Sequence, residues 1–466
     1  MSRKAYFWSA IDSFGIQAVQ FVITIALARM IAPSAFGIFA IALAITNLSQ
    51  VIVDGGFSIA LIRRHRVSKN TLYSVFYTNV LVSFFLFLFI YISSDSIGSF
   101  FESTLLSEIL KISCFTVLIS SLSVIPKVIL TKRMDFKRQA LASFISSLLG
   151  GGIAIVMAIQ GYGIWALLCQ SITFSIANSI ILIKLSGWRL QGKMSLKVIR
   201  ALLLFSGQLL LSSILDLIYK SLLPMFIGKQ YGMSSVGYYN QSTKLSELPA
   251  MVITNVTQKV SYPQLCNAKS IAEKVNIFLT TLKISTIIIF PLMAFVSINA
   301  KDLVELVLGH NWTKASDILK VIAISFMLYP VHAINLNLLK VFGKGSEFFR
   351  LEIIKKIIAL MVILGAIVTK SSIDVFFVLI VFMSIFNVYV NGFYTSKLIG
   401  VTWIKQFKVL GPNILYTVFA SSISIFLTSR IENIFYSIIT SAIAGLTCLI
   451  IICYIFEGKY YAKFIK

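Results

Sequence analysis

Long apolar stretches alternate with short polar segments along the whole chain. An α-helix crosses the hydrocarbon core of a bilayer in about 20 residues, and about fourteen stretches reach that length. They cover residues 7–30, 36–62, 72–94, 108–130, 139–160, 162–185, 201–228, 237–262, 275–298, 316–342, 353–369, 373–396, 409–428 and 433–456. The pattern predicts an all-α polytopic membrane protein with about 14 transmembrane helices, and leaves about 12 as the alternative count.

The composition supports this prediction. Apolar residues make up 58% of the chain and charged residues 12%, whereas soluble domains have roughly 45–50% and 25%. So few charges could not cover the surface of soluble domains. Because the spans leave only short connections, the sequence also argues against an enzyme with a large soluble catalytic domain.

The net charge of +24 follows the predicted topology. Segments on one side of the membrane hold 27 of the 41 Lys and Arg residues, and those on the other side hold 5. Positive charge marks cytoplasmic loops, so both termini are predicted to be cytoplasmic. The basic character is therefore explained by topology and by contact with anionic membrane lipids, and nucleic acid is not an expected partner.

An internal repeat divides the chain. Residues 35–39 resemble residues 235–239, which places Gly37 and Gly237 at an offset of 200. Residues 126–128 and 134–138 likewise resemble residues 339–341 and 346–350. The repeat predicts two six-helix bundles at residues 1–198 and 199–400, followed by two additional spans at residues 401–466. Two homologous bundles are typical of alternating-access transporters, in which the substrate binds between them.

Ionisable residues deep in a membrane cost roughly 2.5–3.5 kcal/mol each on insertion scales, so each one needs a reason. The deep set comprises Asp12, Asp54, Asp216, Lys220, Lys244, Glu247 and Lys283. Asp216 and Lys220 are four residues apart, and Lys244 and Glu247 are three apart, so each pair shares a helix face. Two interpretations stay open: self-neutralising structural pairs, or groups that line a water-filled cavity.

A second set of cations lies nearer the ends of the spans. Arg29 is predicted near the outer face, and Lys127, Lys259 and Lys340 near the inner face. Long basic side chains at these depths commonly extend to the lipid headgroups. Because Lys127 and Lys340 hold matching places in the two repeats, they could instead form a cationic mouth that binds phosphate.

The span at residues 237–262 is unusually polar, with a run of Tyr, Asn, Gln, Ser and Thr at residues 238–243. Such a surface does not face lipid and must contact protein or water. Tyr239, Asn240 and Gln241 have the groups that sugar hydroxyls bind, although helix–helix hydrogen bonding would use the same groups.

The sequence contains no recognisable catalytic motif. It has no DxD pair, no glycine-rich phosphate loop followed by Lys-Ser or Lys-Thr, and no GxSxG. It also has no CxxC pair or histidine cluster to bind a metal. We therefore expect no cofactor, no metal and no enzymatic activity.

Three segments resemble a known family. Residues 27–37 (LARMIAPSAFG), 54–64 (DGGFSIALIRR) and 132–138 (KRMDFKR) resemble the bacterial polysaccharide-repeat flippases of O-antigen, capsule and colanic-acid type. That family belongs to the multidrug/oligosaccharidyl-lipid/polysaccharide exporter superfamily. The likeness is clearest over the first four spans, and Arg63 stands where the family usually has Gln.

The resemblance implies a V-shaped fold around a central cavity. It implies transfer of a polyprenyl-diphosphate-linked oligosaccharide across the bacterial inner membrane, with the polysaccharide polymerase machinery as a partner. The expected cavity or mouth residues are Arg29, Lys127, Lys220, Lys244, Lys259, Lys283, Lys340, Tyr239, Asn240 and Gln241. The candidate ion-coupling residues are Asp12, Asp54, Asp216 and Glu247.

Two rival functions remain at the level of sequence. A cation-coupled small-molecule exporter of the same superfamily would use Asp12 to bind its ion. A polytopic polysaccharide polymerase or ligase would ordinarily have a longer outer loop than those near residues 95–107 and 299–315. The sequence does not determine the sugar, the coupling ion or the oligomeric state.

Overall fold

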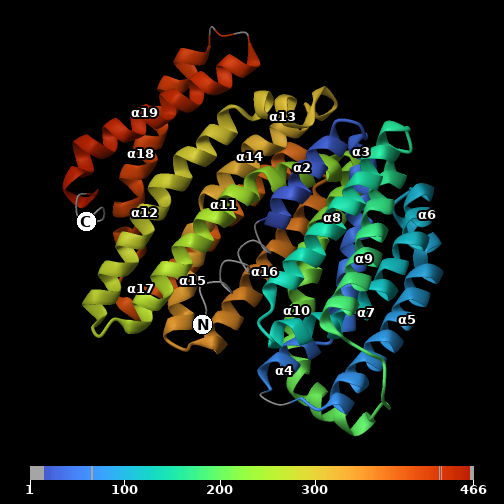
Figure 1. The fold of residues 1–466 in the computed structure, drawn as a ribbon. Helices are drawn as coiled ribbons and strands as arrows, with labels where there is room; N and C mark the ends of the chain where they lie inside the picture. Colours follow the sequence, from blue (N-terminus) through green and yellow to red (C-terminus); the bar gives the residue numbers. More distant parts are fainter. Residues whose placement is uncertain (1–14, 65–66, 430, 432, 462–466) are drawn as a thin grey trace. The chain divides into compact units, whose positions relative to one another are not determined.

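The structure is a computed structural model that describes residues 15–64, 67–429, 431 and 433–461 (Figure 1). Within these residues every regular element is a helix. Nine helical stretches there are long and apolar enough to cross a membrane, and the helices Ile16–Ala28 and Ile434–Thr447 are apolar but shorter. The prediction of an all-α, multi-pass membrane protein is confirmed. The count of fourteen spans stays a prediction.

Contacts within the chain divide it into two compact units, unit 1 (Met1–Gly237) and unit 2 (Tyr238–Lys466). The described helices of unit 1 are α2 (Ile16–Ala28), α3 (Pro33–Asp54), α4 (Phe57–Arg63), α5 (Lys69–Phe100), α6 (Thr104–Ser113), α7 (Phe115–Lys132), α8 (Phe136–Ile159), α9 (Ile164–Ser186) and α10 (Leu196–Tyr231). Helix α11 (Met233–Asn267) begins in unit 1 and continues into unit 2.

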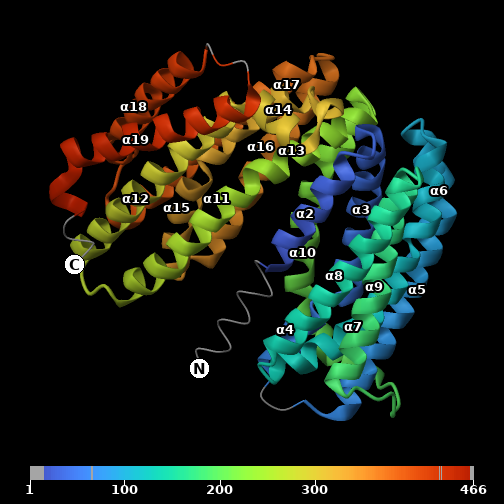
Figure 2. The ribbon, with the colours of Figure 1, turned by 45° about the horizontal axis from the view of Figure 1, so that its top comes forward.

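Unit 1 is built around α3 and α7. Helix α3 packs against α5, α6, α7, α9 and α10, and α7 packs against α5 and α9. Figures 1 and 2 show α5 and α6 side by side, and α8 and α9 side by side. Because α10 packs on α3, α4 and α5, it belongs to unit 1. The repeat boundary at residues 198/199 stays a prediction.

The described helices of unit 2 that follow α11 surround an apolar core. They are α12 (Ile271–Ile298), α13 (Ala300–Leu308), the short 3-10 helix η2 (His310–Trp312), α14 (Ala315–Met327), α15 (Tyr329–Val341), α16 (Gly345–Val368), α17 (Ile373–Ile399), α18 (Trp403–Thr428) and α19 (Ile434–Tyr461). The core joins buried residues of α11, α12, α15, α17 and α18, with Phe278 and Met293 fully buried. Helices α18 and α19 run side by side and pack on α12 (Figures 1 and 2).

Polar caps fix where several helices begin. A side-chain oxygen at the N-cap accepts a hydrogen bond from a backbone N–H of the first turn, which would otherwise lack a partner. The residues that do so are Ser68, Ser103, Asp135, Ser270, Ser372 and Thr402. These caps mark the first residues of helices in an apolar sequence that has few other signals of where a helix begins.

The two sequence repeats have the same local structure around their fourth span. In the first repeat, this span is two helices, α6 and α7, that meet at Cys114; in the second, it is α14 and α15, which meet at Leu328. Each is followed by a residue with a left-handed backbone, Met134 (φ 56°) and Gly343 (φ 67°). The shared break and turn support the repeat inferred from the sequence.

The two repeat glycines, Gly37 and Gly237, lie at a close helix crossing within unit 1. A Cβ atom added to Gly37 would lie 1.8 Å from the carbonyl oxygen of Met233. A Cβ atom added to Gly237 would lie 2.1 Å from the carbonyl oxygen of Pro33. Both neighbours are backbone atoms, so only glycine allows this approach. The contact is symmetric, since each glycine meets the residue four positions before the other.

Candidate functional site

The predicted site residues differ in their exposure. The basic side chains of Arg29, Lys127, Lys220, Lys244, Lys259 and Lys340 are exposed, and Lys283 is half-buried. Asp54 and Glu247 are half-buried. Asp12 and the side chain of Asp216 lie outside the described residues, so the predicted pairing of Asp216 with Lys220 stays a prediction.

The polar stretch of α11 has a packed face. Tyr239 stacks on Phe377 with ring centroids 5.9 Å apart. Ser242 donates a hydrogen bond of 2.9 Å to the carbonyl oxygen of Ala315. Gln241 is only 2% exposed, and its Nε2 has no hydrogen-bond partner among the described residues. Tyr239 and Ser242 thus pack α11 against its neighbours, and the predicted contacts of Tyr239 and Gln241 with sugar stay predictions.

The same helix has a second, more open polar face. Asn240, Lys244 and Glu247 lie at i, i+4 and i+7, so they form one stripe along α11. Lys244 is exposed, and the other two are half-buried. No ion pair within 4.0 Å joins Lys244 to Glu247 in the described structure. The stripe therefore presents an amide, an ammonium and a carboxylate that are all available to a polar ligand.

A buried hydrogen-bond network joins helices α14, α15 and α17 in unit 2. His332 on α15 contacts Ser384 through Nε2 and Asn391 through Nδ1, each at 3.2 Å. Since the Asn391 amide nitrogen donates to Nδ1, and Ser384 can accept, the network assigns a neutral imidazole with its proton on Nε2. Ser384 in turn donates to the carbonyl oxygen of Ser325.

The buried polar cluster also has a second, separate set of hydrogen bonds, which reaches α18. Thr395 donates a hydrogen bond of 2.6 Å to the Asn335 amide oxygen, and the Asn335 nitrogen donates to Gln406 at 3.2 Å. Several of its polar atoms have no partner in the described part of the chain, among them Asn391 Oδ1 and Gln406 Nε2. Buried groups without partners cost about 1–3 kcal/mol each. Such atoms are suited to bind water or a neutral polar group.

This network was not among the predicted site residues. The signal that could have found it is the spacing of Asn387, Asn391 and Thr395 at i, i+4 and i+8, which places three polar groups on one face of the apolar helix α17. His332 and Asn335 repeat this on α15 at i and i+3. A single polar residue in an apolar helix does not by itself predict a functional site. The prediction requires its hydrogen-bond partners on a second helix, which the sequence does not identify.

The motif residues of the basic loop at residues 132–138 have a structural role in unit 1. Lys132 donates through Nζ to the carbonyl oxygens of Leu61, at 3.1 Å, and Arg64. Arg133 donates to the carbonyl oxygen of Ser186 at 3.0 Å. These carbonyls end α4 and α9, where a cation neutralises the partial negative charge of the helix terminus. The loop thus ties together two of the segments that carry the family resemblance.

Asp54 is engaged within its own segment. It is the last residue of α3, and its carboxylate accepts a hydrogen bond from the hydroxyl of Ser58 in α4. Between them, Gly55 and Gly56 both have left-handed backbones with φ of 57° and 70°. The bond therefore holds together a turn that only glycine forms easily.

A family profile described as "Polysaccharide biosynthesis protein" matches residues 26–317, which is more than half of the chain. The succinoglycan biosynthesis transport protein ExoT of Rhizobium meliloti (strain 1021) is 24% identical over 352 residues, 75% of this chain and 71% of that protein. The lipopolysaccharide biosynthesis protein WzxC of Escherichia coli (strain K12) is 23% identical over 331 residues, 70% of this chain and 66% of that protein.

Solved structures show the same fold at lower identity. The lipid II flippase MurJ, in an inward closed conformation, superposes with a TM-score of 0.78 and 16% identity over 98% of this chain and 99% of that one. An inward-facing MATE multidrug transporter of the MOP superfamily gives a TM-score of 0.60 and 16% identity over 89% of this chain and 98% of that one. The chain belongs to the Polysaccharide biosynthesis protein family and has the helical membrane fold found in the MOP superfamily.

Proposed function

We propose that this protein flips a polyprenyl-diphosphate-linked oligosaccharide repeat unit across the bacterial inner membrane by alternating access. The unit would then enter the synthesis of a surface polysaccharide such as O-antigen, capsule or exopolysaccharide. The family match over residues 26–317 carries the proposal, since it covers the repeat segments at residues 35–39 and 235–239 and the motifs at residues 27–37, 54–64 and 132–138. The names of ExoT and WzxC, as a transport protein and a lipopolysaccharide biosynthesis protein, agree with it.

The substrate has three parts with different chemistry, and the chain offers a surface for each. The polyprenyl tail remains among the lipid-facing apolar helices. The diphosphate is anionic, so it binds exposed ammonium groups such as those of Lys127 and Lys340. The sugars need groups that donate and accept hydrogen bonds, which the open stripe of α11 provides with Asn240 and Glu247.

Lys127 and Lys340 are proposed as the cytoplasmic phosphate-binding cations, together with the remaining basic residues of the predicted set. Each lies on the second helix of a broken span, α7 or α15, ahead of a left-handed turn. Lys340 also lies 5.6 Å above the ring of Phe348. Both termini are proposed to face the cytoplasm, because the basic loops lie on their side.

Asp12, Asp54, Asp216 and Glu247 remain the proposed carboxylates for ion coupling. Of these, Glu247 lies on the open stripe beside Lys244, where a proton or cation that binds the carboxylate would change the local charge. The protein is proposed to act as a transporter, and no residue is proposed for group transfer or hydrolysis. The polysaccharide polymerase machinery is its proposed partner after transfer.

The test is complementation of a defined repeat-unit flippase deletion. Restored surface polysaccharide, with loss of the accumulated lipid-linked units by mass analysis, supports the proposal. Unchanged accumulation, with equal membrane expression, contradicts it for that repeat unit. The MATE-like fold makes a small-molecule exporter the second candidate, and drug susceptibility of a deletion strain with normal polysaccharide would favour it.

A further inference from the structure

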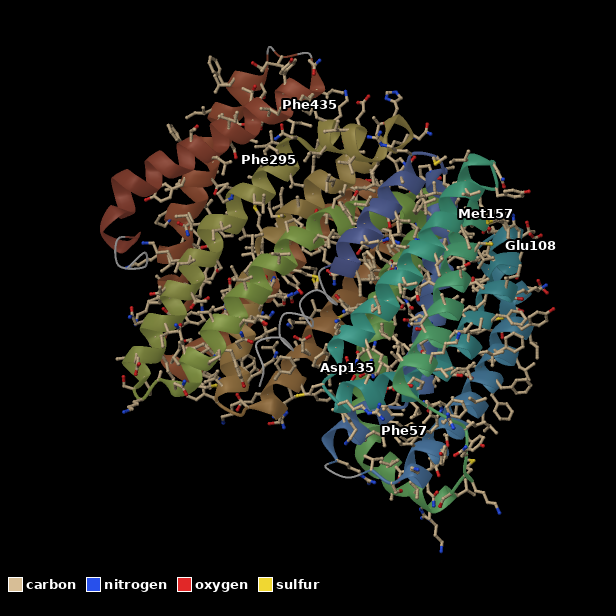
Figure 3. All side chains as sticks on the ribbon, in the orientation of Figure 1. Phe57, Glu108, Asp135, Met157, Phe295 and Phe435 are labelled. Atoms are coloured by element: carbon tan, nitrogen blue, oxygen red, sulfur yellow. The ribbon has the colours of Figure 1, made fainter. Side chains whose placement is uncertain are left out.

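A cavity of about 440 Å³ lies beside the turn that joins α5 to α6 in unit 1. Apart from Gly98, every residue that lines it has a hydroxyl, carboxylate or ammonium side chain. The volume falls within the roughly 300–1,000 Å³ of small-molecule sites. Figure 3 shows Glu108, which lines the cavity, toward the end of unit 1 opposite Asp135, so the predicted topology places the cavity on the non-cytoplasmic side.

The turn beside the cavity is tightly constructed. Glu102 has a left-handed backbone with φ of 54°, which is uncommon for a residue other than glycine. The Ser103 N–H donates to the carbonyl oxygen of Gly98 at 2.9 Å, and the Ser103 side chain caps α6. A Cβ atom at Gly98 would lie only 1.8 Å from Ser107 Oγ. Glycine at this position lets α5 approach the hydroxyl of Ser107 on α6.

Two of the three carboxylates at the cavity are already neutralised. Asp95 pairs with Lys111 at 2.8 Å, and Glu102 pairs with Lys229 at 2.7 Å. The hydrogen bond and charge of Lys229 hold the pKa of the Glu102 carboxyl below its ordinary value. Glu108 is exposed and forms no ion pair within 4.0 Å in the described structure. The cavity therefore has nearly balanced charge and one available carboxylate.

Ser107 is the observation that points to a ligand. It is 8% exposed, it lines the cavity, and its hydroxyl makes no hydrogen bond within the described part of the chain. The oxygen of this hydroxyl is not among the fully buried polar atoms that lack a partner, so it keeps accessible surface at the cavity. A bound molecule that both donates and accepts hydrogen bonds would satisfy it.

The lining determines the chemical class of that molecule. Within the residues that the structure describes, Glu108 is an unpaired carboxylate, and Lys111, the one cation in the lining, is already paired with Asp95, so the lining disfavours a phosphate group. No group of three or more His, Cys, Asp or Glu among the described residues could hold a metal ion. The lining contains no aliphatic or aromatic residue, although much of its surface is formed by the carbon atoms of polar side chains. Hydroxyl groups of a sugar, by contrast, donate to carboxylates and accept from Lys111 and from serine hydroxyls.

We propose that this cavity binds an uncharged saccharide on the non-cytoplasmic face of the protein. The site lies apart from the residues proposed for transport. The saccharide would be a sugar of the exported glycan after transfer. This identity rests on the proposed function, whereas saccharide binding by the cavity does not.

The test is saturation-transfer NMR on the full chain in phospholipid nanodiscs, with cellobiose, lactose and N,N′-diacetylchitobiose as probes. Transfer to at least one disaccharide is expected, and it should be lost in Ser107→Leu, which fills the cavity. Ser96→Leu is the matched control, because Ser96 is exposed on α5 and does not line the cavity. Glu108→Gln, at an exposed position, should weaken binding about tenfold by removing a charged acceptor.

Several results would overturn the proposal. These are no transfer to any of the three disaccharides, equal transfer in Ser107→Leu and in Ser96→Leu, and binding of spermidine or inorganic phosphate in place of the disaccharides. Should Ser107→Leu fail to fold, Glu108→Gln decides alone, and unchanged affinity there counts against the site. Failure of the flippase complementation would leave these binding results unaffected, so the two proposals are separable.

The predicted face is tested separately with Ser99→Cys, since Ser99 is exposed at the cavity. A membrane-impermeant thiol reagent added to spheroplasts should label it above the level of the parent protein. Labelling only after the membrane is opened would refute the assignment to the non-cytoplasmic face.

Discussion

Replacing Gly37 or Gly237 by alanine tests whether the close crossing in unit 1 is essential to its packing. The added Cβ atoms would lie 1.8 Å and 2.1 Å from carbonyl oxygens, whereas real Cβ contacts stay beyond 3.0 Å. Because the opposing atoms are backbone, the two helix segments must separate by about an ångström. Overpacking of this kind costs about 1–3 kcal/mol. Alanine in place of a helical glycine returns up to about 1 kcal/mol.

The double variant Gly37→Ala/Gly237→Ala sharpens this prediction. One separation of the segments relieves both clashes, so the double variant should lose about as much stability as one single variant, and less than the sum of both. The assay is thermal unfolding of purified protein in detergent, followed by tryptophan fluorescence. Gly152→Ala is the matched control: nothing lies within 4 Å of its added Cβ, so its stability should be unchanged or slightly higher. Strictly additive losses, or a Gly37→Ala variant as stable as Gly152→Ala, would refute the reasoning.

Three further predictions address other parts of the molecule. Neutralising Lys127 and Lys340 together, each to methionine, should impair export more than either change alone at equal membrane levels; full polysaccharide display by the double variant would argue against phosphate binding there. Thr395→Val removes the donor to the buried Asn335 amide oxygen and should cost about 1–3 kcal/mol, measured by thermal unfolding; an unchanged unfolding temperature would show that the bond contributes nothing. Because the folded-state pKa of Glu102 is lowered, its ion pair stabilises the turn above the ordinary carboxyl pKa near 4.5 and loses this effect as pH falls through the folded value. Protection factors of the amides at residues 101–104, which take out the fall of the intrinsic exchange rate with pH, should therefore decrease on acidification in the parent protein but not in Glu102→Gln, and identical pH profiles would contradict the role of the pair.

Most of the fold could be predicted because a bilayer requires each spanning segment to be a long apolar helix. Each predicted span overlaps one or two described helices, with α2 covering part of the first, since about 20 apolar residues have few alternatives to a helix in lipid. The breaks at Cys114 and Leu328 were not predicted; Pro330, in the first turn of α15, is a signal for the second break, whereas the apolar surroundings of Cys114 contain none. The repeat centred on Gly37 and Gly237 was visible in the sequence, but the contact between these glycines required the structure.

Site prediction was harder for a physical reason. Intramembrane charges stand out in sequence, so residues such as Lys244 and Glu247 were easily chosen, although their roles stay proposals. Neutral polar residues carry a weaker signal, and the network around His332 and Asn335 depends on partners 50 to 70 residues away. Similarly, Lys132 could be recognised as part of a family motif, but its hydrogen bonds to the end of α4 follow only from the fold.

The central claim is that this chain carries a lipid-linked oligosaccharide between leaflets. The most direct measurement is the leaflet location of that lipid in spheroplasts of a flippase-deficient strain, with and without this protein. A membrane-impermeant glycosidase or lectin added from outside should reach the sugar only when the protein is expressed. Sugar that stays inaccessible at full expression, or that becomes accessible equally without the protein, would contradict the account.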